Sequence, residues 1–175
     1  DGEIRWRKDV KIGYVPQKIE ADLHLPLTTY DLLAAKERVM NLKRSATETV
    51  ALSVDLPSEV LKIPIGHLSG GQFQKALIAF ALLGEPNVIL FDEPTASLDL
   101  PREEQVYELI HRLQKKYGLT VILVSHDLSL VYRYASKVLC LNRRGLCFGT
   151  PSEVLTLKVL QELYGREHKY YKHEH

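Results

Sequence analysis

One stretch of the chain, residues 68–99, constrains the fold more than any other. It opens with Leu-Ser-Gly-Gly-Gln at 68–72, continues in an apolar, helix-like run, and reaches Val-Ile-Leu-Phe-Asp-Glu-Pro at 88–94. Four apolar residues before two acids are typical of a buried parallel strand that delivers Asp92 and Glu93 at its carboxyl end. Open α/β sheets bind their ligands at that edge. The pattern therefore predicts an α/β fold with two carboxylates placed for nucleotide hydrolysis.

Each piece of this stretch also has a simpler interpretation. A Ser-Gly-Gly turn can serve only as a helix cap, and an apolar strand can end in two acids without a catalytic role. Found together and in this order, however, the motifs resemble those of the ATP-binding cassette (ABC) ATPase family, and the resemblance covers nearly the whole chain. It implies a RecA-like core, mostly parallel with helices on both sheet faces, formed by residues 1–23 and 73–165. A small helical subdomain is expected at about residues 24–70.

The resemblance assigns roles to four polar residues. Asp92 matches the carboxylate that holds the water shell of Mg²⁺, and Glu93 matches the base that polarises the attacking water. Gln17 matches the glutamine that contacts the magnesium ion and that water. His126 follows the apolar run 119–125 and matches the switch histidine that contacts the γ-phosphate. In isolation, Gln17 and His126 could each be an ordinary polar residue at the end of a strand.

The motif at 68–72 resembles the signature of the family, which contacts the ATP held by a second protomer. A helix that begins here offers free N–H groups and a partial positive charge to an anion. The signature residues that we expect at the nucleotide are Ser69, Gly70, Gly71 and Gln72. The resemblance therefore implies a homodimer with ATP and Mg²⁺ as its cofactors.

Asp99 has two compatible interpretations. It matches the aspartate that crosses the dimer interface in the family. It also precedes Pro101 and a helical pattern that ends at Gly118, which makes it a candidate helix N-cap.

The resemblance also predicts a loop that the sequence does not contain. None of the 175 residues forms a G-x-x-x-x-G-K-[ST] run, which holds phosphates through backbone amides and a lysine. In the family this loop lies upstream of the position of Gln17. We therefore expect an N-terminally truncated ATPase that is inactive alone. Such a chain should expose an apolar cleft and aggregate or pair abnormally.

Composition excludes some classes of partner. The chain has 23 Lys and Arg against 22 Asp and Glu, so no net field attracts it to nucleic acid or to an anionic bilayer. It has no run of 18 apolar residues, and residues 1–11 are too charged for a signal peptide. These features predict a soluble, cytoplasmic protein, and the resemblance adds peripheral attachment to the cytoplasmic face of the membrane.

The cysteines and the C-terminal tail each leave an alternative open. Cys140 and Cys147 flank a turn at 142–145 and lie opposite each other if that turn closes a two-residue hairpin. In a cytosolic protein, packed and reduced thiols are favoured over a bond, and two thiols alone do not make a metal site. Three histidines in the tail 166–175 could bind a transition metal, but a solvated, partly disordered tail is favoured.

Local patterns predict most of the remaining elements. Thr28 and Asp31 form a candidate capping box for a helix with four apolar positions, Leu32, Leu33, Val39 and Met40. The further elements that we expect are a hairpin arm at 1–11, a strand at 11–17, a helix at 47–54, an amphipathic helix after Asp99 that buries Val106, Leu109, Ile110 and Leu113, a second buried strand at 119–125, a hairpin at 137–149, and a helix opened by residues 150–153.

The resemblance implies the ATP-hydrolysing subunit of an ABC transporter, with transmembrane permease subunits and, indirectly, a substrate-binding protein as partners. The run 14–28 and the signature helix resemble the zinc and manganese importer branch. Two alternatives remain. The absent phosphate loop favours a non-catalytic or vestigial ABC-like protein. A soluble ABC ATPase working on nucleic acid or ribosomes is disfavoured by the near-zero charge and the single cassette.

Overall fold

The computed structural model describes residues 3–17, 19, 26–43, 45–95, 98–142, 145–156 and 159–160. Contacts divide the chain into two compact units, Asp1–His126 and Asp127–His175, and each is described by itself. Within the described residues, no helix has both the length and the apolar character needed to cross a membrane.

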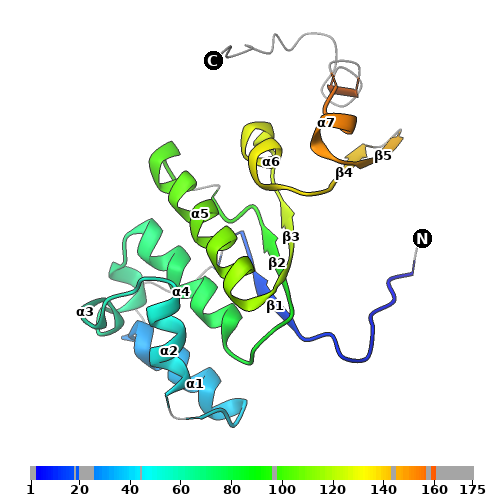
Figure 1. Ribbon diagram of the computed structural model, residues 1–175. Helices are drawn as coiled ribbons and strands as arrows, with labels where there is room; N and C mark the ends of the chain where they lie inside the picture. Colours follow the sequence, from blue (N-terminus) through cyan, green and yellow to red (C-terminus); the bar gives the residue numbers. More distant parts are fainter. Residues whose placement is uncertain are drawn as a thin grey trace. The chain divides into compact units, whose positions relative to one another are not determined.

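A three-stranded parallel sheet forms the centre of the first unit (Figure 1). Its strands are β1 (Ile12–Val15), β2 (Val88–Asp92) and β3 (Thr120–Val124), in the order β1-β2-β3. Because all three strands are parallel, their carboxyl ends meet at one edge of the sheet. The predicted α/β class is confirmed.

Helices connect and cover these strands, and α1 and α2 pack beside α4 (Figure 1). The helical elements of this unit are α1 (Thr29–Val39), α2 (Ala46–Ser53), α3 (Ser58–Leu61), a 3₁₀ turn at Ile65–His67, α4 (Gly70–Leu82) and α5 (Leu100–Tyr117). The helices predicted at 47–54 and after Asp99 are confirmed. Val106, Leu109, Ile110 and Leu113 of α5 are buried, as their spacing on one helix face predicts.

Only one face of the sheet is fully covered in this unit. The side chains of Val15, Ile89 and Phe91 are buried in one cluster with α4 and α5. On the opposite face, Ile122 and Val124 remain 48% and 54% exposed. Among the described residues of this unit, helices cover one face of the sheet. The strand predicted at 119–125 is present as β3, but the prediction that it is a buried strand is wrong, because alternate side chains of β3 point to the open face.

Capping explains where the helices start. The Thr28 hydroxyl accepts a hydrogen bond from the Asp31 N–H, and the Asp31 carboxylate accepts one from the Thr28 N–H. Of the four apolar positions predicted for α1, Leu33 is fully buried. Val39 and Met40 are 86% and 44% exposed, because the helix ends there and its last turn leaves the core.

The N-terminal hairpin arm is a wrong prediction. Residues 3–11 contain no strand, and the first strand begins at Ile12. Ile4 and Trp6 are 80% and 48% exposed. Their alternation resembles a strand, but no described segment pairs with them, and a lone strand is not stable in water.

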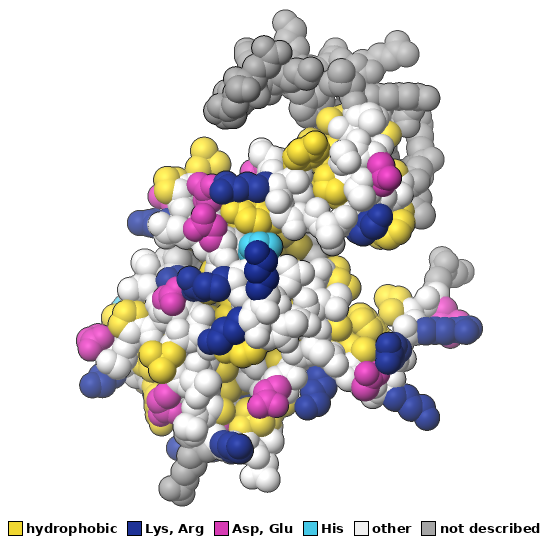
Figure 2. Space-filling model, in the orientation of Figure 1, with side chains coloured by type: hydrophobic (Ala, Val, Ile, Leu, Met, Phe, Trp, Pro, Cys, Tyr) yellow, Lys and Arg dark blue, Asp and Glu magenta, His cyan; other side chains and the backbone are white. Residues whose placement is uncertain are grey.

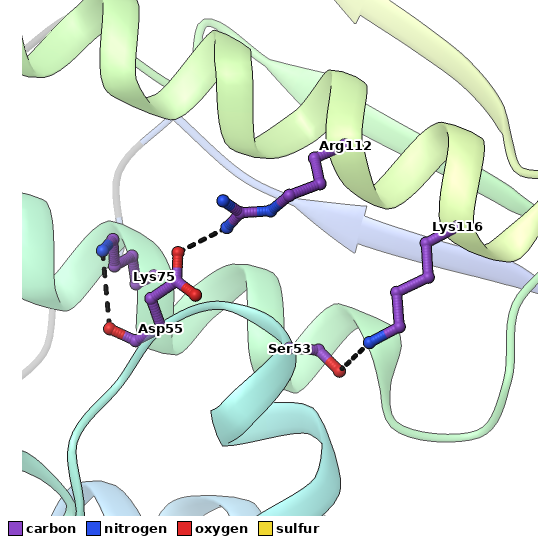
Figure 3. Close-up of polar contacts among 5 residues, drawn as sticks. All are labelled: Ser53, Asp55, Lys75, Arg112 and Lys116. Atoms are coloured by element: carbon purple, nitrogen blue, oxygen red, sulfur yellow. Dashed lines mark hydrogen bonds and ion pairs between the residues drawn. The ribbon is translucent and has the colours of Figure 1, made fainter.

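Polar contacts join the end of α2 and the residues after it to α4 and α5 (Figure 3). Arg112 Nη2 donates a hydrogen bond to a carboxylate oxygen of Asp55. The main-chain carbonyl oxygen of Asp55 accepts a second hydrogen bond, from Lys75 Nζ, at 3.5 Å. Lys116 Nζ donates to Ser53 Oγ at 3.4 Å. Arg112 and Asp55 are more than half exposed, so these contacts orient the two segments more than they stabilise the fold.

The second unit contains a two-stranded hairpin between short helices. Its elements are α6 (Leu128–Tyr134), β4 (Val138–Asn142), β5 (Gly145–Gly149) and α7 (Pro151–Val154). The hairpin and the Thr150–Glu153 capping box are confirmed. Cys140 pairs directly with Cys147, with Cα atoms 4.9 Å apart, and the two sulfurs form a disulfide. The prediction of reduced thiols is wrong in this structure, because the register brings the Cα atoms into disulfide range.

Candidate functional site

The carboxyl ends of the strands bring three predicted catalytic residues together. Gln17 follows β1, Glu93 follows β2 and His126 follows β3. Gln17 Nε2 donates to Glu93 Oε2 at 2.6 Å, and His126 Nδ1 lies 3.6 Å from Glu93 Oε1. The Glu93 carboxylate is therefore held between an amide donor and an imidazole.

The main chain at Glu93 takes a conformation that few side chains adopt. Its φ is +44°, in the left-handed region, and its N–H donates to the Val124 carbonyl at 3.1 Å. Non-glycine residues in this region often occur at functional sites. The Glu93 side chain is 29% exposed, whereas that of His126 is 74% exposed, so the carboxylate is the more enclosed partner.

Asp92 has a partner that the sequence analysis missed. The Tyr14 hydroxyl, on the neighbouring strand β1, donates to Asp92 Oδ2 at 3.3 Å. Partial burial raises the pKa of Tyr14, and the charge and hydrogen bond of Asp92 raise it further. Tyr14 therefore remains a protonated donor at neutral pH. The sequence did contain a signal for this contact, because Tyr14 lies one residue before the buried Val15 on a strand that was predicted to end beside the two acids.

A small cavity of about 140 Å³ opens beside Glu93. Its lining is mostly polar and comes from the loops after β2 and β3 and from the first turn of α5. The lining residues are Glu93, Thr95, Leu98, Glu103, Ser125 and His126. The cavity can hold a few water molecules next to the Glu93 carboxylate.

Local hydrogen bonds between Ser69 and Gln72 order the signature motif. The Ser69 hydroxyl accepts from the Gln72 N–H at 3.3 Å, and Gln72 Oε1 accepts from the Ser69 N–H at 3.0 Å. This capping box starts α4 at Gly70. Ser69, Gly71 and Gln72 line a separate hollow of about 280 Å³. Within one chain, the signature and Glu93 thus line different cavities.

Asp99 is the N-cap of α5. Its side chain accepts a hydrogen bond from the Arg102 N–H at 3.3 Å, and Gly118 ends the helix in the left-handed conformation. The predicted capping role is confirmed. The predicted role at a dimer interface stays a prediction, and the neighbouring Ser97 lies outside the described residues.

Comparisons with known proteins decide the family. The family model described as "ABC transporter" matches residues 2–96. The chain belongs to the ABC transporter family. The zinc import ATP-binding protein ZnuC of Haemophilus influenzae is 37% identical over 178 residues, which cover 99% of this chain and 65% of that protein. ZnuC of Cereibacter sphaeroides is 40% identical over 94% of this chain and 66% of that protein.

Solved ABC structures agree with the sequence relatives. A structure described as an inward-facing metal-chelate type ABC transporter has a TM-score of 0.80 and 28% identity, covering 89% of this chain and 64% of that one. The cbiO1 protein of Clostridium perfringens, part of the ABC transporter complex cbiONQ, has a TM-score of 0.71 and 28% identity, covering 86% and 61%. The chain spans about two thirds of the length of the curated ABC relatives it matches.

The donor set of this ABC chain fits magnesium. Mg²⁺ binds through one or two carboxylates and keeps several of its waters, and the Asp92 carboxylate is a hard oxygen donor at the strand end. Among the described residues, no three His, Cys, Asp or Glu side chains gather as an all-protein metal site. The histidines predicted as a metal-binding alternative in the tail 166–175 lie outside the described residues.

Charged side chains of both signs lie on the surface of this ABC chain. Figure 2 shows acidic and basic side chains interspersed over the face in view. This distribution agrees with the formal net charge of +1.

Proposed function

We propose that this chain is the hydrolytic part of the ATP-binding subunit of an ABC importer for a divalent metal ion, zinc or manganese. The observation that carries the proposal is the Glu93 carboxylate, held by Gln17 at 2.6 Å and faced by His126 at 3.6 Å. The relatives described as zinc import ATP-binding proteins support the substrate class, as does the metal-chelate type structure.

In this mechanism Glu93 is the base. Its carboxylate polarises the water that attacks the γ-phosphate, and the cavity beside Glu93 has room for that water. Gln17 and His126 orient the carboxylate and that water, and His126 also contacts the γ-phosphate. Asp92, fixed by Tyr14, would hold Mg²⁺. When bound, the ion supplies positive charge that offsets the charge developing on the phosphate oxygens.

The proposed assembly is a homodimer. Ser69, Gly70, Gly71 and Gln72 of one protomer contact the ATP held by the other, and Asp99 lies at the interface. The proposed dimer is supported by the separation of two cavities within one chain, because the signature residues line one cavity and Glu93 lines the other. A single protomer therefore does not bring the signature residues and Glu93 to one phosphate. Residues 24–70 form the helical subdomain that docks on the permease. The subunit works at the cytoplasmic face of the membrane, and a substrate-binding protein delivers the ion.

The test of this function is transport by the assembled protein. We expect permease-containing vesicles with the whole ATP-binding subunit that contains these residues to hydrolyse ATP and take up zinc or manganese in an ATP-dependent way. Radiometal uptake and phosphate release are measured in the same vesicles. ATP hydrolysis without uptake of either ion would contradict the substrate assignment. Neither hydrolysis nor uptake would instead favour the non-catalytic ABC-like protein.

The isolated 175-residue chain should behave differently. We expect little or no binding of Mg-ATP, because these residues contain no G-x-x-x-x-G-K-[ST] run to hold the phosphates. Calorimetric titration of the purified chain measures this directly, with Mg-ADP as a second nucleotide. Tight binding would contradict the prediction and would require a different set of phosphate contacts.

A further inference from the structure

Helix α5 contacts the loop that follows β2. The Thr95 hydroxyl donates to Glu103 Oε1, in the first turn of α5, at 2.7 Å. Thr95 lies two residues after Glu93 and is only 7% exposed. The N–H of Leu98 donates to the Thr95 carbonyl at 2.9 Å, so the loop is held at Thr95 by both side chain and main chain.

The same helix contacts the loop that follows β3. The Tyr107 hydroxyl donates to Ser125 Oγ at 3.1 Å, and Ser125 directly precedes His126. Tyr107 is 2% exposed, so its ring is fixed by packing. Glu103 and Tyr107 are four residues apart and therefore lie on one face of α5.

The chemistry of the Glu103 contact suits a residue that holds the loop after β2 in place. Glu103 lies in the first turn of α5, where the helix dipole stabilises a carboxylate. A charged acceptor makes a stronger hydrogen bond to the Thr95 hydroxyl than a neutral one. Glu103 also lines the cavity that contains Glu93 and His126. Glu103 therefore lies next to Glu93 and His126 but is not itself a reacting group.

We propose that Glu103 and Tyr107 are positioning residues of the hydrolytic site. Through Thr95 and Ser125 they hold the two loops that carry Glu93 and His126, and so they set the spacing of the base and the switch histidine. His126 is 74% exposed and cannot be fixed by its own packing, so its position depends on the adjacent anchored residue. Small displacements of catalytic groups lower rates strongly. The inference rests on the proposed ATP hydrolysis.

Removal of single hydroxyl groups in the assembled ATPase tests this inference. We expect Tyr107→Phe and Thr95→Val each to lower kcat about tenfold with the KM for ATP near its wild-type value, because the loops shift while nucleotide contacts remain. Thr95→Ser keeps the hydroxyl and should restore most of the wild-type kcat. A matched control is Tyr117→Phe, which removes a hydroxyl from the same helix. That hydroxyl contacts Ser53, outside the cavity lining, and kcat should not change.

The outcomes separate this inference from the proposed function. A wild-type protein that hydrolyses no ATP overturns the proposed function, and this inference with it. If the wild type is active, unchanged kcat in both Tyr107→Phe and Thr95→Val overturns the inference alone. So does an equal loss in Tyr117→Phe, or a loss in Thr95→Ser as large as in Thr95→Val. If Tyr107→Phe does not fold, as judged by thermal unfolding, the Thr95 pair decides the question.

Discussion

In the assembled ATPase, replacing Glu93 with glutamine is expected to lower ATP hydrolysis by roughly 10²–10⁴-fold while ATP binding is retained. The amide is nearly isosteric with the carboxylate, so Gln17 and His126 keep a polar partner at the site. An amide cannot accept the proton of the attacking water, however. The dimer should therefore close on ATP and remain closed, because reopening follows hydrolysis.

The measurement needs two readouts on the same protein. Single-turnover phosphate release gives the rate, and light scattering after gel filtration with ATP gives the fraction of closed dimer. Glu108→Gln is the matched control, since it makes the same chemical change at an exposed position of α5. It should leave both readouts unchanged. Normal turnover in Glu93→Gln would show that Glu93 is not the base, whatever the dimer does.

Local signals explain why much of the fold could be predicted from sequence. A capping box needs only two residues three apart, so Thr28 with Asp31 was sufficient to place the start of α1. A parallel strand buried on at least one face gives an apolar run, so Val88–Asp92 could be predicted with Asp92 as its last residue and Glu93 directly after it. Parallel strands then bring Gln17, Glu93 and His126 to one edge without further information.

Some side-chain contacts of the site could not be predicted because they join residues that are distant in the sequence. The Tyr14 hydroxyl reaches Asp92 across 78 positions, and the contact depends on the β1–β2 register, which no local pattern defines. The Thr95–Glu103 and Tyr107–Ser125 hydrogen bonds depend on how α5 packs against the loops that follow β2 and β3. These polar side chains therefore appear in the sequence as ordinary loop and helix residues.

The wrong predictions have the same origin. Alternation in residues 1–11 was interpreted as a strand, but a strand needs a partner, and the described residues provide none for 3–11. The cysteines were assigned as thiols from the expected compartment, whereas the β4–β5 register brings their Cα atoms within 4.9 Å. In both cases the sequence pattern was present, and the pairing of segments decided the outcome.

A position where helix and strand approach closely should be the most sensitive to an added methyl group. Gly13 on β1 lies against α4, and a Cβ at Gly13 would come 2.7 Å from the Ala81 carbonyl oxygen and 3.3 Å from its carbonyl carbon. Ala81 is 1% exposed and contributes main-chain atoms, which cannot rotate away as a side chain could. Helix and strand would have to separate, and the buried cluster between them would loosen.

Gly13→Ala is therefore expected to lower the free energy of unfolding by about 3 kcal/mol, at the upper end of the usual cost of overpacking. Urea unfolding of the assembled protein measures the change. Gly71→Ala is the matched control, because a Cβ there meets nothing within 4 Å and Gly71 lies in the first turn of α4. Alanine is a better helix residue, so this variant should be unchanged or more stable by up to about 1 kcal/mol. Equal effects of the two substitutions would contradict the close-approach argument, since only one of the two glycines faces main-chain atoms.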